Sequence, residues 1–212
     1  MKSSFNEMLE IILVTYNRAQ YLEATLERLR TSPIAGCKFT VIDNGSTDRT
    51  PEVCARFAQK FTNFHVRRNP FNVGISGNYL RALETASSPY TWIICDDDDF
   101  DFTHFDEIIT AVTSDQYDLI SVNVPNHSVL PRGETIRAAD LIKDGRYNFF
   151  YTGSFIPCTI FRPRLIKPEM MLRGYYSIHT IFSNLYFLVY AVKQNALIYV
   201  TRYDYIINRQ EN

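Results

Sequence analysis

The sequence predicts an α/β fold with a mostly parallel central sheet and helices on both of its faces. In the first half of the chain, short runs rich in β-branched and aromatic residues alternate with segments whose apolar residues recur at helical spacing. Strands and helices that alternate in this way form βαβ units with right-handed crossovers. The length of 212 residues suits a single domain with a sizeable core.

The first half is predicted to contain four strands and three helices. Its apolar runs place strands at residues 11–16, 39–42, 63–66 and 90–95. Apolar residues from Leu22 to Leu29 repeat at helical spacing after the first strand. Thr50 followed by Pro51 is a typical helix start after the second strand, and a third helix begins near Ser76.

The second half has a weaker pattern. Thr103 and Asp106 resemble a capping box at the start of a helix. Further strands are predicted at residues 118–124, 155–161 and 196–200, and further helices at 138–143 and 177–192.

Four consecutive aspartates, Asp96 to Asp99, directly follow the apolar strand at 90–95. Like charges at the end of a buried strand are costly unless a cation or hydrogen-bond donors meet them. Carboxylate oxygens suit Mg²⁺ or Mn²⁺, particularly where a phosphate supplies further oxygens. The alternative is a solvated acidic turn that caps the next helix.

Two other roles for the acidic run fit the sequence poorly. An EF-hand calcium loop that starts at Asp96 needs glycine at its sixth position, where the chain has Asp101. A phosphatase of the haloacid-dehalogenase type needs a small or β-branched residue after its Asp-x-Asp, usually behind the first strand. Here Phe100 occupies that place, and the strand is the fourth.

The polar segments that follow the four strands are expected to meet. They are residues 15–18, 43–48, 69–74 and 96–99. Parallel strands end at the same edge of a sheet, and open α/β sheets bind their ligands at that edge. Four polar segments that converge there predict a binding site.

Composition excludes some classes of function. A net charge of −1 gives no basic footprint, so no nucleic-acid partner is expected. The start of the chain has no signal-peptide pattern, and the longest apolar stretch, 181–192, is shorter than the ~20 residues of a membrane span. The four cysteines are scattered, as is usual for reduced thiols. A cytoplasmic protein without a transmembrane segment is therefore expected.

The four polar segments together resemble glycosyltransferase family 2 over roughly residues 9–105. The segments that carry the resemblance are Val14-Thr15-Tyr16-Asn17-Arg18, residues 42–48, residues 72–78 and the aspartates. The resemblance implies a GT-A (Rossmann-like) fold, a nucleotide-sugar donor and inversion of the anomeric centre. It implies one domain over 1–212, with a nucleotide-sugar-binding half (1–100) and an acceptor-binding half (101–212). More loosely, and through no single motif, the chain resembles the N-terminal domain of a chlorella-virus enzyme that glycosylates the capsid.

The resemblance also implies roles for individual residues. Those matched to the nucleotide sugar are Thr15, Tyr16, Asn17, Arg18, Asp43, Asn72, Gly74, Asn78, Asp96 and Asp97. Tyr16 would offer a ring to the nucleobase, and Asp43 would accept from a base N–H, which favours uracil. A turn role for Asp43 and a simple helix start at 72–78 are the alternatives.

A divalent cation, Mn²⁺ or Mg²⁺, is expected between the diphosphate and the acidic run. Asp96 and Asp98 match the Asp-x-Asp pattern, with Asp98 on the metal and Asp96 (or Asp97) on the ribose or a water. Four aspartates leave this register open by one residue. Asp99 could instead face the acceptor or cap the next helix.

The general base is the point at which the sequence departs from the family. Many members have Glu-Asp at the start of a helix in the second half, where this chain has Ser183 and Asn184. Neither can accept a proton, so His179, about one helical turn earlier, is the candidate base. The further candidates are Asp140, Asp144 and Glu169.

The predicted function is transfer of a sugar from a UDP-sugar to an acceptor hydroxyl on a glycan or glycoprotein. The alternative is a non-catalytic module that binds a nucleotide sugar within a larger protein.

Overall fold

The computed structural model describes residues 4–145, 147–180 and 182–207. In its first half the elements are α1 Phe5–Met8, β1 Leu9–Thr15, α2 Ala19–Leu29, β2 Lys38–Asp43, α3 Thr50–Phe57, β3 Phe64–Arg68, α4 Gly74–Thr85 and β4 Tyr90–Cys95. In its second half they are β5 Asp99–Phe100, α5 Asp106–Ser114, β6 Leu119–Asn123, β7 Thr135–Arg137, α6 Ala138–Asp144, α7 Phe149–Ser154, β8 Thr159–Phe161, α8 Pro168–Tyr176, α9 Asn184–Lys193, β9 Leu197–Asp204 and β10 Ile206–Ile207. Two short 3₁₀ turns, Ile156–Cys158 and Pro163–Leu165, flank β8.

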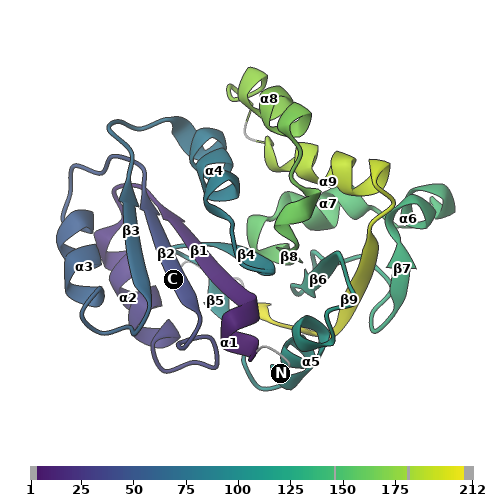
Figure 1. Cartoon of the computed structure of the whole chain (residues 1–212), viewed down its shortest axis with the longest axis horizontal. Helices are drawn as coiled ribbons and strands as arrows, with labels where there is room; N and C mark the ends of the chain where they lie inside the picture. Colours follow the sequence, from purple (N-terminus) through teal and green to yellow (C-terminus); the bar gives the residue numbers. More distant parts are fainter. Residues whose placement is uncertain (1–3, 146, 181, 208–212) are drawn as a thin grey trace.

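One eight-stranded sheet runs through both halves, in the order β3-β2-β1-β4-β8-β6-β9-β7 (Figure 1). The four strands of the first half are parallel to their neighbours. β8 is antiparallel to β4 and to β6, so β4 and β6 run in the same direction on either side of it. β9 is parallel to β6, and β7 is antiparallel to β9. The carboxyl ends of β1, β2, β4 and β6 therefore lie at one edge of the sheet.

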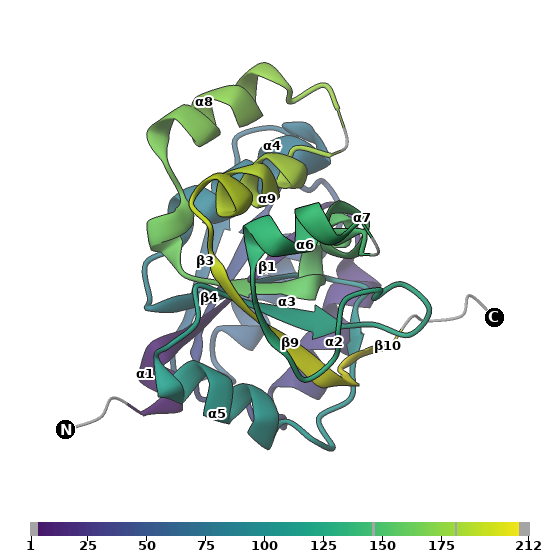
Figure 2. The same cartoon turned by 90° about the vertical axis from the view of Figure 1, so that its right-hand side faces the viewer.

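Helices cover both faces of the sheet, as predicted. Every residue of β1 is buried, because side chains alternate between two apolar layers. Ile11 and Leu13 pack in the layer formed with α2, α3 and α5, whereas Ile12 and Val14 pack in the layer formed with α4, α7 and α9. Figure 2 shows α5 on one side of the strands and α4, α6, α7, α8 and α9 on the other.

The first-half prediction is confirmed with small shifts of the boundaries, and the second half requires three corrections. The strand expected at 155–161 is a 3₁₀ turn followed by the three-residue β8. The capping box at Thr103 is not formed, because the Thr103 hydroxyl donates to Asp101 and α5 begins only at Asp106.

The third correction concerns the helix expected at 177–192, which begins at Asn184. The preceding segment is tied to α4 instead. The Ser76 hydroxyl donates to the carbonyl of Thr180, and the Ser183 hydroxyl donates to the carbonyl of Ser76. His179 therefore lies in a connection and not on a helical turn before Ser183. Among the described residues, no helix combines the length and the apolar character needed to cross a bilayer.

Candidate functional site

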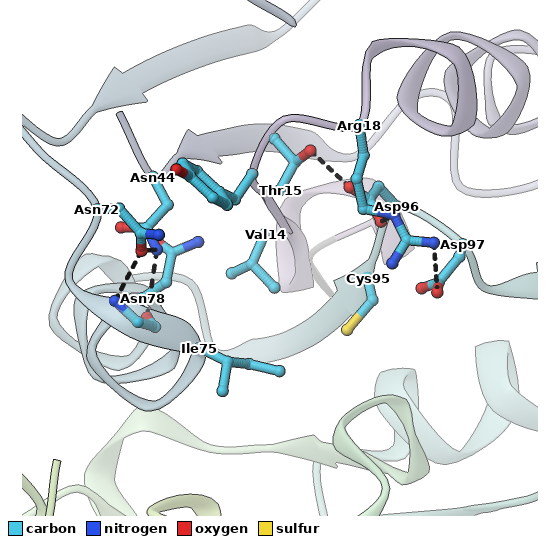
Figure 3. Close-up of a pocket in the computed structure, with 12 residues that line it drawn as sticks. Val14, Thr15, Arg18, Asn44, Asn72, Ile75, Asn78, Cys95, Asp96 and Asp97 are labelled. Carbon is cyan, nitrogen blue, oxygen red and sulfur yellow. Dashed lines mark hydrogen bonds and ion pairs between the residues drawn. The ribbon is translucent and has the colours of Figure 1, made fainter. Parts of the chain in front are cut away.

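A cavity of about 310 Å³ lies at the sheet edge where β1, β2 and β4 end and α4 begins (Figure 3). Its lining residues are Val14, Thr15, Tyr16, Arg18, Asn44, Asn72, Gly74, Ile75, Asn78, Cys95, Asp96 and Asp97. Eight of the ten residues predicted for the nucleotide sugar are thus brought together; Asn17 and Asp43 are not part of the lining. The converging segments were therefore predicted correctly from the order of the strands.

Two carboxylates of the acidic run form one wall of the cavity. Asp96 accepts a hydrogen bond from the Thr15 hydroxyl at 2.6 Å. The Arg18 guanidinium lies between Asp96 and Asp97, with Nε 3.3 Å from one and Nη2 2.9 Å from the other (Figure 3). Burial raises the pKa of Asp96 to about 6, although Thr15 and Arg18 oppose the rise.

Asp98 is turned away from this wall. It is 5% exposed, and its Oδ2 accepts from the backbone N–H of Cys95 at 2.6 Å. Burial, together with the charges of Asp97 and Asp96, raises the pKa of Asp98 to about 8. Asp99 is also outside the cavity, 3.2 Å from Arg28. Of the two predicted metal ligands, the structure places Asp96 in the cavity and Asp98 behind it.

A network of asparagine side chains connects the loops around the cavity. Nδ2 of Asn44 donates to Oδ1 of Asn72 at 2.8 Å, and Oδ1 of Asn44 accepts from Nδ2 of Asn69 at 2.9 Å. Nδ2 of Asn69 also lies 3.0 Å from Oδ1 of Asn78. Oδ1 of Asn72 accepts from the N–H of Gly74, whose φ of +77° favours glycine. These contacts hold the loops after β2 and β3 against the start of α4.

Asn17 and Asp48 connect the loops that follow β1 and β2. Oδ1 of Asn17 accepts from the N–H of Thr47 at 2.7 Å, and the backbone N–H of Asn17 donates to the Ser46 hydroxyl. Asp48 accepts from the N–H of Ala19 and from the N–H of Thr50, each at 3.0 Å, and so joins the starts of α2 and α3. Asn17 thus connects two loops, and its contact with the nucleotide sugar stays a prediction.

Asp43 is 1% exposed and lies below the cavity lining. Its Oδ1 accepts from the N–H of Ser46 at 2.9 Å, the turn role that the sequence left open. Its Oδ2 lies 3.2 Å from Nε of Arg68, without the alignment of a hydrogen bond. Among the described residues, this oxygen is one of three buried side-chain polar atoms without a hydrogen-bond partner.

Of the candidate bases, His179, Asp140 and Glu169 lie outside the cavity lining, and the side chain of Asp144 lies outside the described part of the structure. His179 is exposed, in the connection between α8 and α9. At the place of the family's Glu-Asp, Asn184 donates to the carbonyls of Gly153 and Ser154, at 3.0 and 2.9 Å. Ser183 and Asn184 are both buried, and they stabilise the contacts of α9 with α4 and α7.

Sequence reasoning missed the apolar part of the lining and one polar residue. Val14, Ile75 and Cys95 were not predicted as site residues. In the close-up, the Val14 side chain lies between the asparagines and Asp96, and those of Ile75 and Cys95 lie near it (Figure 3). Asn44 was overlooked beside Asp43, although the Asp-Asn-Gly-Ser turn contains it. The part of the chain that the structure describes has no cluster of three His, Cys, Asp or Glu side chains suited to a metal ion. The cavity thus offers two carboxylates, and further ligands would come from the bound molecule.

Residues 10–178 match the family model described as glycosyl transferase family 2. The chain is 32% identical over 95 residues to abequosyltransferase RfbV of Salmonella typhimurium, which covers 43% of this chain and 28% of that protein. It is 21% identical over 177 residues to the cholesterol galactosyltransferase of Borreliella burgdorferi, covering 77% and 49%. The chain thus spans less than half the length of these curated relatives.

Solved structures show the same fold. The structure of S. aureus TarS 1-349 in complex with UDP-GlcNAc has a TM-score of 0.69 at 21% identity, covering 96% of this chain and 59% of that one. The mannosyltransferase PcManGT from Pyrobaculum calidifontis, in complex with GDP-Man and Mn²⁺, has a TM-score of 0.63 at 16% identity, covering 95% and 56%. These likenesses confirm the predicted GT-A (Rossmann-like) α/β fold. The looser resemblance to a chlorella-virus enzyme stays a prediction.

Proposed function

Because the chain belongs to glycosyl transferase family 2, we propose that it transfers a sugar from a UDP-sugar to an acceptor hydroxyl, with inversion. The acceptor is a glycan or glycoprotein, and the donor binds mainly to residues 1–100. The observation that carries this proposal is the cavity at the carboxyl edge, where an asparagine network faces a wall of two carboxylates. The cavity combines polar side chains that can fix a nucleotide with an apolar side. A cytoplasmic location stays a prediction.

The residues of the cavity suit a divalent cation. Asp96 and Asp97 already share one positive charge, the guanidinium of Arg18. In the arrangement described, these two carboxylates would hold Mn²⁺ or Mg²⁺ together with diphosphate oxygens. Asp98 could join them only if its side chain left the N–H of Cys95. Bound there, the cation would supply Lewis-acid stabilisation of the leaving diphosphate.

The nucleobase would lie near Tyr16 and Asp43. Tyr16 is a partly exposed ring on the cavity wall, so it is available for stacking. Oδ2 of Asp43 is a buried acceptor without a hydrogen-bond donor among the described residues, and the N–H of uracil would supply one. Leaving such an acceptor unpaired costs ~1–3 kcal/mol. UDP is therefore expected to bind more tightly than CDP, whose base has no donor at that position.

A second function, a module that binds a nucleotide sugar without catalysis, is favoured by one observation. Ser183 and Asn184 stand where many members have Glu-Asp, and both are committed to buried hydrogen bonds. A chain without a base would still bind UDP-sugar but would not turn it over.

Calorimetric titration with UDP tests the proposal. UDP should bind in Mn²⁺ and should lose at least about tenfold in affinity, or about 1.4 kcal/mol, in chelator. Asp97→Asn should reduce the effect of the cation, whereas Asp99→Asn, which changes a carboxylate paired with Arg28 outside the cavity, should not. Equal affinity in Mn²⁺ and in chelator would contradict the metal role of the acidic run. Turnover of bound UDP-sugar separates the enzyme from the binding module.

A further inference from the structure

An inverting sugar transfer requires a base that removes the proton from the acceptor hydroxyl. This requirement rests on the proposed function. Asn184 cannot meet it, because a carboxamide has no basic nitrogen and its Nδ2 is already donating to Gly153 and Ser154. The base must therefore come from another residue near the acidic run.

The register of the sheet identifies which part of the second half lies closest to that run. Trp92 of β4 and Ile120 of β6 both pair with Ile160 of β8, from opposite sides. Asp96 follows Trp92 by four residues, and Val124 follows Ile120 by four residues, in strands that run in the same direction. Asp96 and Val124 therefore lie at a similar position along the strand direction. Two strand spacings, or about 10 Å, separate them.

His127 is held at this point by a tight turn. Its N–H and the N–H of Ser128 both lie within hydrogen-bond distance of the Val124 carbonyl, at 3.3 and 3.2 Å. The Ser128 hydroxyl in turn accepts from the N–H of Val124 at 2.8 Å. His127 thus lies in the turn that follows β6, four residues beyond Asn123, on the edge of the sheet that carries the acidic run.

The imidazole of His127 is oriented by two contacts with α7. Its Nε2 lies 2.8 Å from the backbone carbonyl of Tyr151, and its ring is stacked on the Tyr151 ring at 4.3 Å. A carbonyl only accepts, so this contact assigns the proton to Nε2. Nδ1 then carries the lone pair, and among the described residues it has no hydrogen-bond partner. The ring is half-buried and positioned with its basic nitrogen free.

The turn between α7 and β8 connects His127 to the acidic run. The ring of Phe155 lies 5.7 Å from that of His127, and the N–H of Cys158 donates to the Phe155 carbonyl. The indole N–H of Trp92, four residues before Asp96 on β4, donates to the carbonyl of Pro157 in the same turn at 2.7 Å. Phe155 and Tyr151 also give this side of the site an aromatic surface of the kind that packs against sugar rings.

We infer that His127 is the general base of the transfer, and that the acceptor binds between the acidic run and the rings of His127, Tyr151 and Phe155. The acceptor oxygen forms a bond to the anomeric carbon of the donor, whose bond to the diphosphate oxygen breaks. The hydroxyl proton moves to Nδ1 of His127, and the UDP leaves with the electron pair of the broken bond. The Tyr151 carbonyl continues to accept from Nε2 and stabilises the imidazolium that forms.

His179 is less well placed for this role. It is exposed in the connection that α4 holds through Ser76 and Thr180, and within the described part of the chain no side-chain hydrogen bond orients its ring. A base that is held in position loses less conformational freedom in the transition state than one that is free to rotate.

UDP release from UDP-glucose, UDP-galactose and UDP-GlcNAc, with Mn²⁺, tests the inference, with water and a panel of methyl glycosides as acceptors. His127→Gln keeps an N–H for the Tyr151 carbonyl but has no basic nitrogen. It should lower kcat by ~10²–10⁴-fold, the usual effect of losing a general base. UDP affinity and the thermal midpoint should not change. Added imidazole should restore part of the turnover of His127→Ala, which a structural role would not allow.

His65→Gln is the matched control, because His65 is exposed on the edge strand β3. It should turn over like the unmutated protein. Full turnover by His127→Gln, or a fall in UDP affinity equal to the fall in kcat, would overturn the inference, as would a loss confined to His179→Gln. Failure of the unmutated protein to bind UDP would instead overturn the proposed function.

Discussion

Buried carboxylates at the two edges of the sheet have opposite environments. Glu10, at the amino end of β1, is 0% exposed and accepts from the N–H of Ser88 at 2.9 Å, from the Thr91 hydroxyl at 2.8 Å and from the N–H of Ser87. Asp98, beyond the carboxyl end of the adjacent β4, accepts from one backbone N–H, that of Cys95.

The pKa values of the two groups move in opposite directions as a result. Burial alone would raise the pKa of Glu10, but the hydrogen bonds from Ser87 and Ser88 and from the Lys38 and Thr91 side chains lower it below its usual value. Burial and the neighbouring aspartates raise the pKa of Asp98 to about 8. A buried carboxylate with a full set of hydrogen-bond donors, such as Glu10, stabilises the fold. A buried carboxylate with few donors beside a cavity, such as Asp98, indicates a functional site. Three substitutions can test this difference.

The largest effect is expected at the amino edge. Glu10→Ala leaves the N–H groups of Ser87 and Ser88 and the Thr91 hydroxyl without their acceptor. Unsatisfied buried donors cost ~1–3 kcal/mol each, so the free energy of unfolding should fall by about 3 kcal/mol or more. Urea denaturation measures the loss, and UDP affinity of the folded fraction serves as the control. A loss below about 1 kcal/mol would show that the donors of Ser87, Ser88 and Thr91 can remain without their acceptor at little cost in stability.

The opposite sign is expected for Asp98→Asn in chelator. Because the pKa of Asp98 is raised from 3.8 to about 8, the folded state holds a proton that the unfolded state releases between these values. The stability of the unmutated protein should therefore fall as pH rises from about 4 to 8. Asp96, with its pKa raised to about 6, contributes in the same direction only up to that pH.

The Asp98→Asn variant isolates the contribution of Asp98 to the fall in stability above pH 6. An amide oxygen can still accept from the N–H of Cys95, without a charge to bury. At pH 8.5 the variant should be more stable than the unmutated protein by about 1 kcal/mol or more. Thermal and urea unfolding across pH 5–9 give the measurement. If the stability of both proteins changed with pH in the same way, a group other than Asp98 would hold the proton.

The halves of the chain differed in how far the sequence predicted them. β1, β2 and β4 are buried on both faces, so each is a mostly apolar run between polar segments. β8 has three residues, too few for a pattern. α7 contains Gly153, which helix propensity disfavours, yet any side chain there would collide with Leu188 of α9. Its helical state depends on a tertiary contact that no local pattern contains.

The site shows the same division. Motif order predicted which segments converge, because parallel strands end at one edge. It did not predict which carboxylates face the cavity, because that depends on individual contacts. The backbone N–H of Cys95 donates to Asp98, whereas Arg18 forms ion pairs with Asp96 and Asp97. His127 carries no motif, and its place beside the acidic run follows only from the pairing of β4 and β6 with β8.

The smallest effect is expected for Lys38→Met, which separates charge from hydrogen bonding at the amino edge. Nζ of Lys38 lies 2.9 Å from Oε2 of Glu10, but its side chain is 30% exposed. Solvent screens such a pair, and exposed ion pairs contribute ~0–1 kcal/mol. The stability of Lys38→Met should therefore fall by less than about 1 kcal/mol, because the donors from Ser87, Ser88 and Thr91 still saturate the carboxylate. Urea denaturation at low and high salt checks this. A loss equal to that of Glu10→Ala would mean that the Lys38 ammonium, and not the hydrogen bonds, stabilises the Glu10 carboxylate. Glu10 and Asp98 would then differ in the charge of their neighbours and not in the number of hydrogen-bond donors.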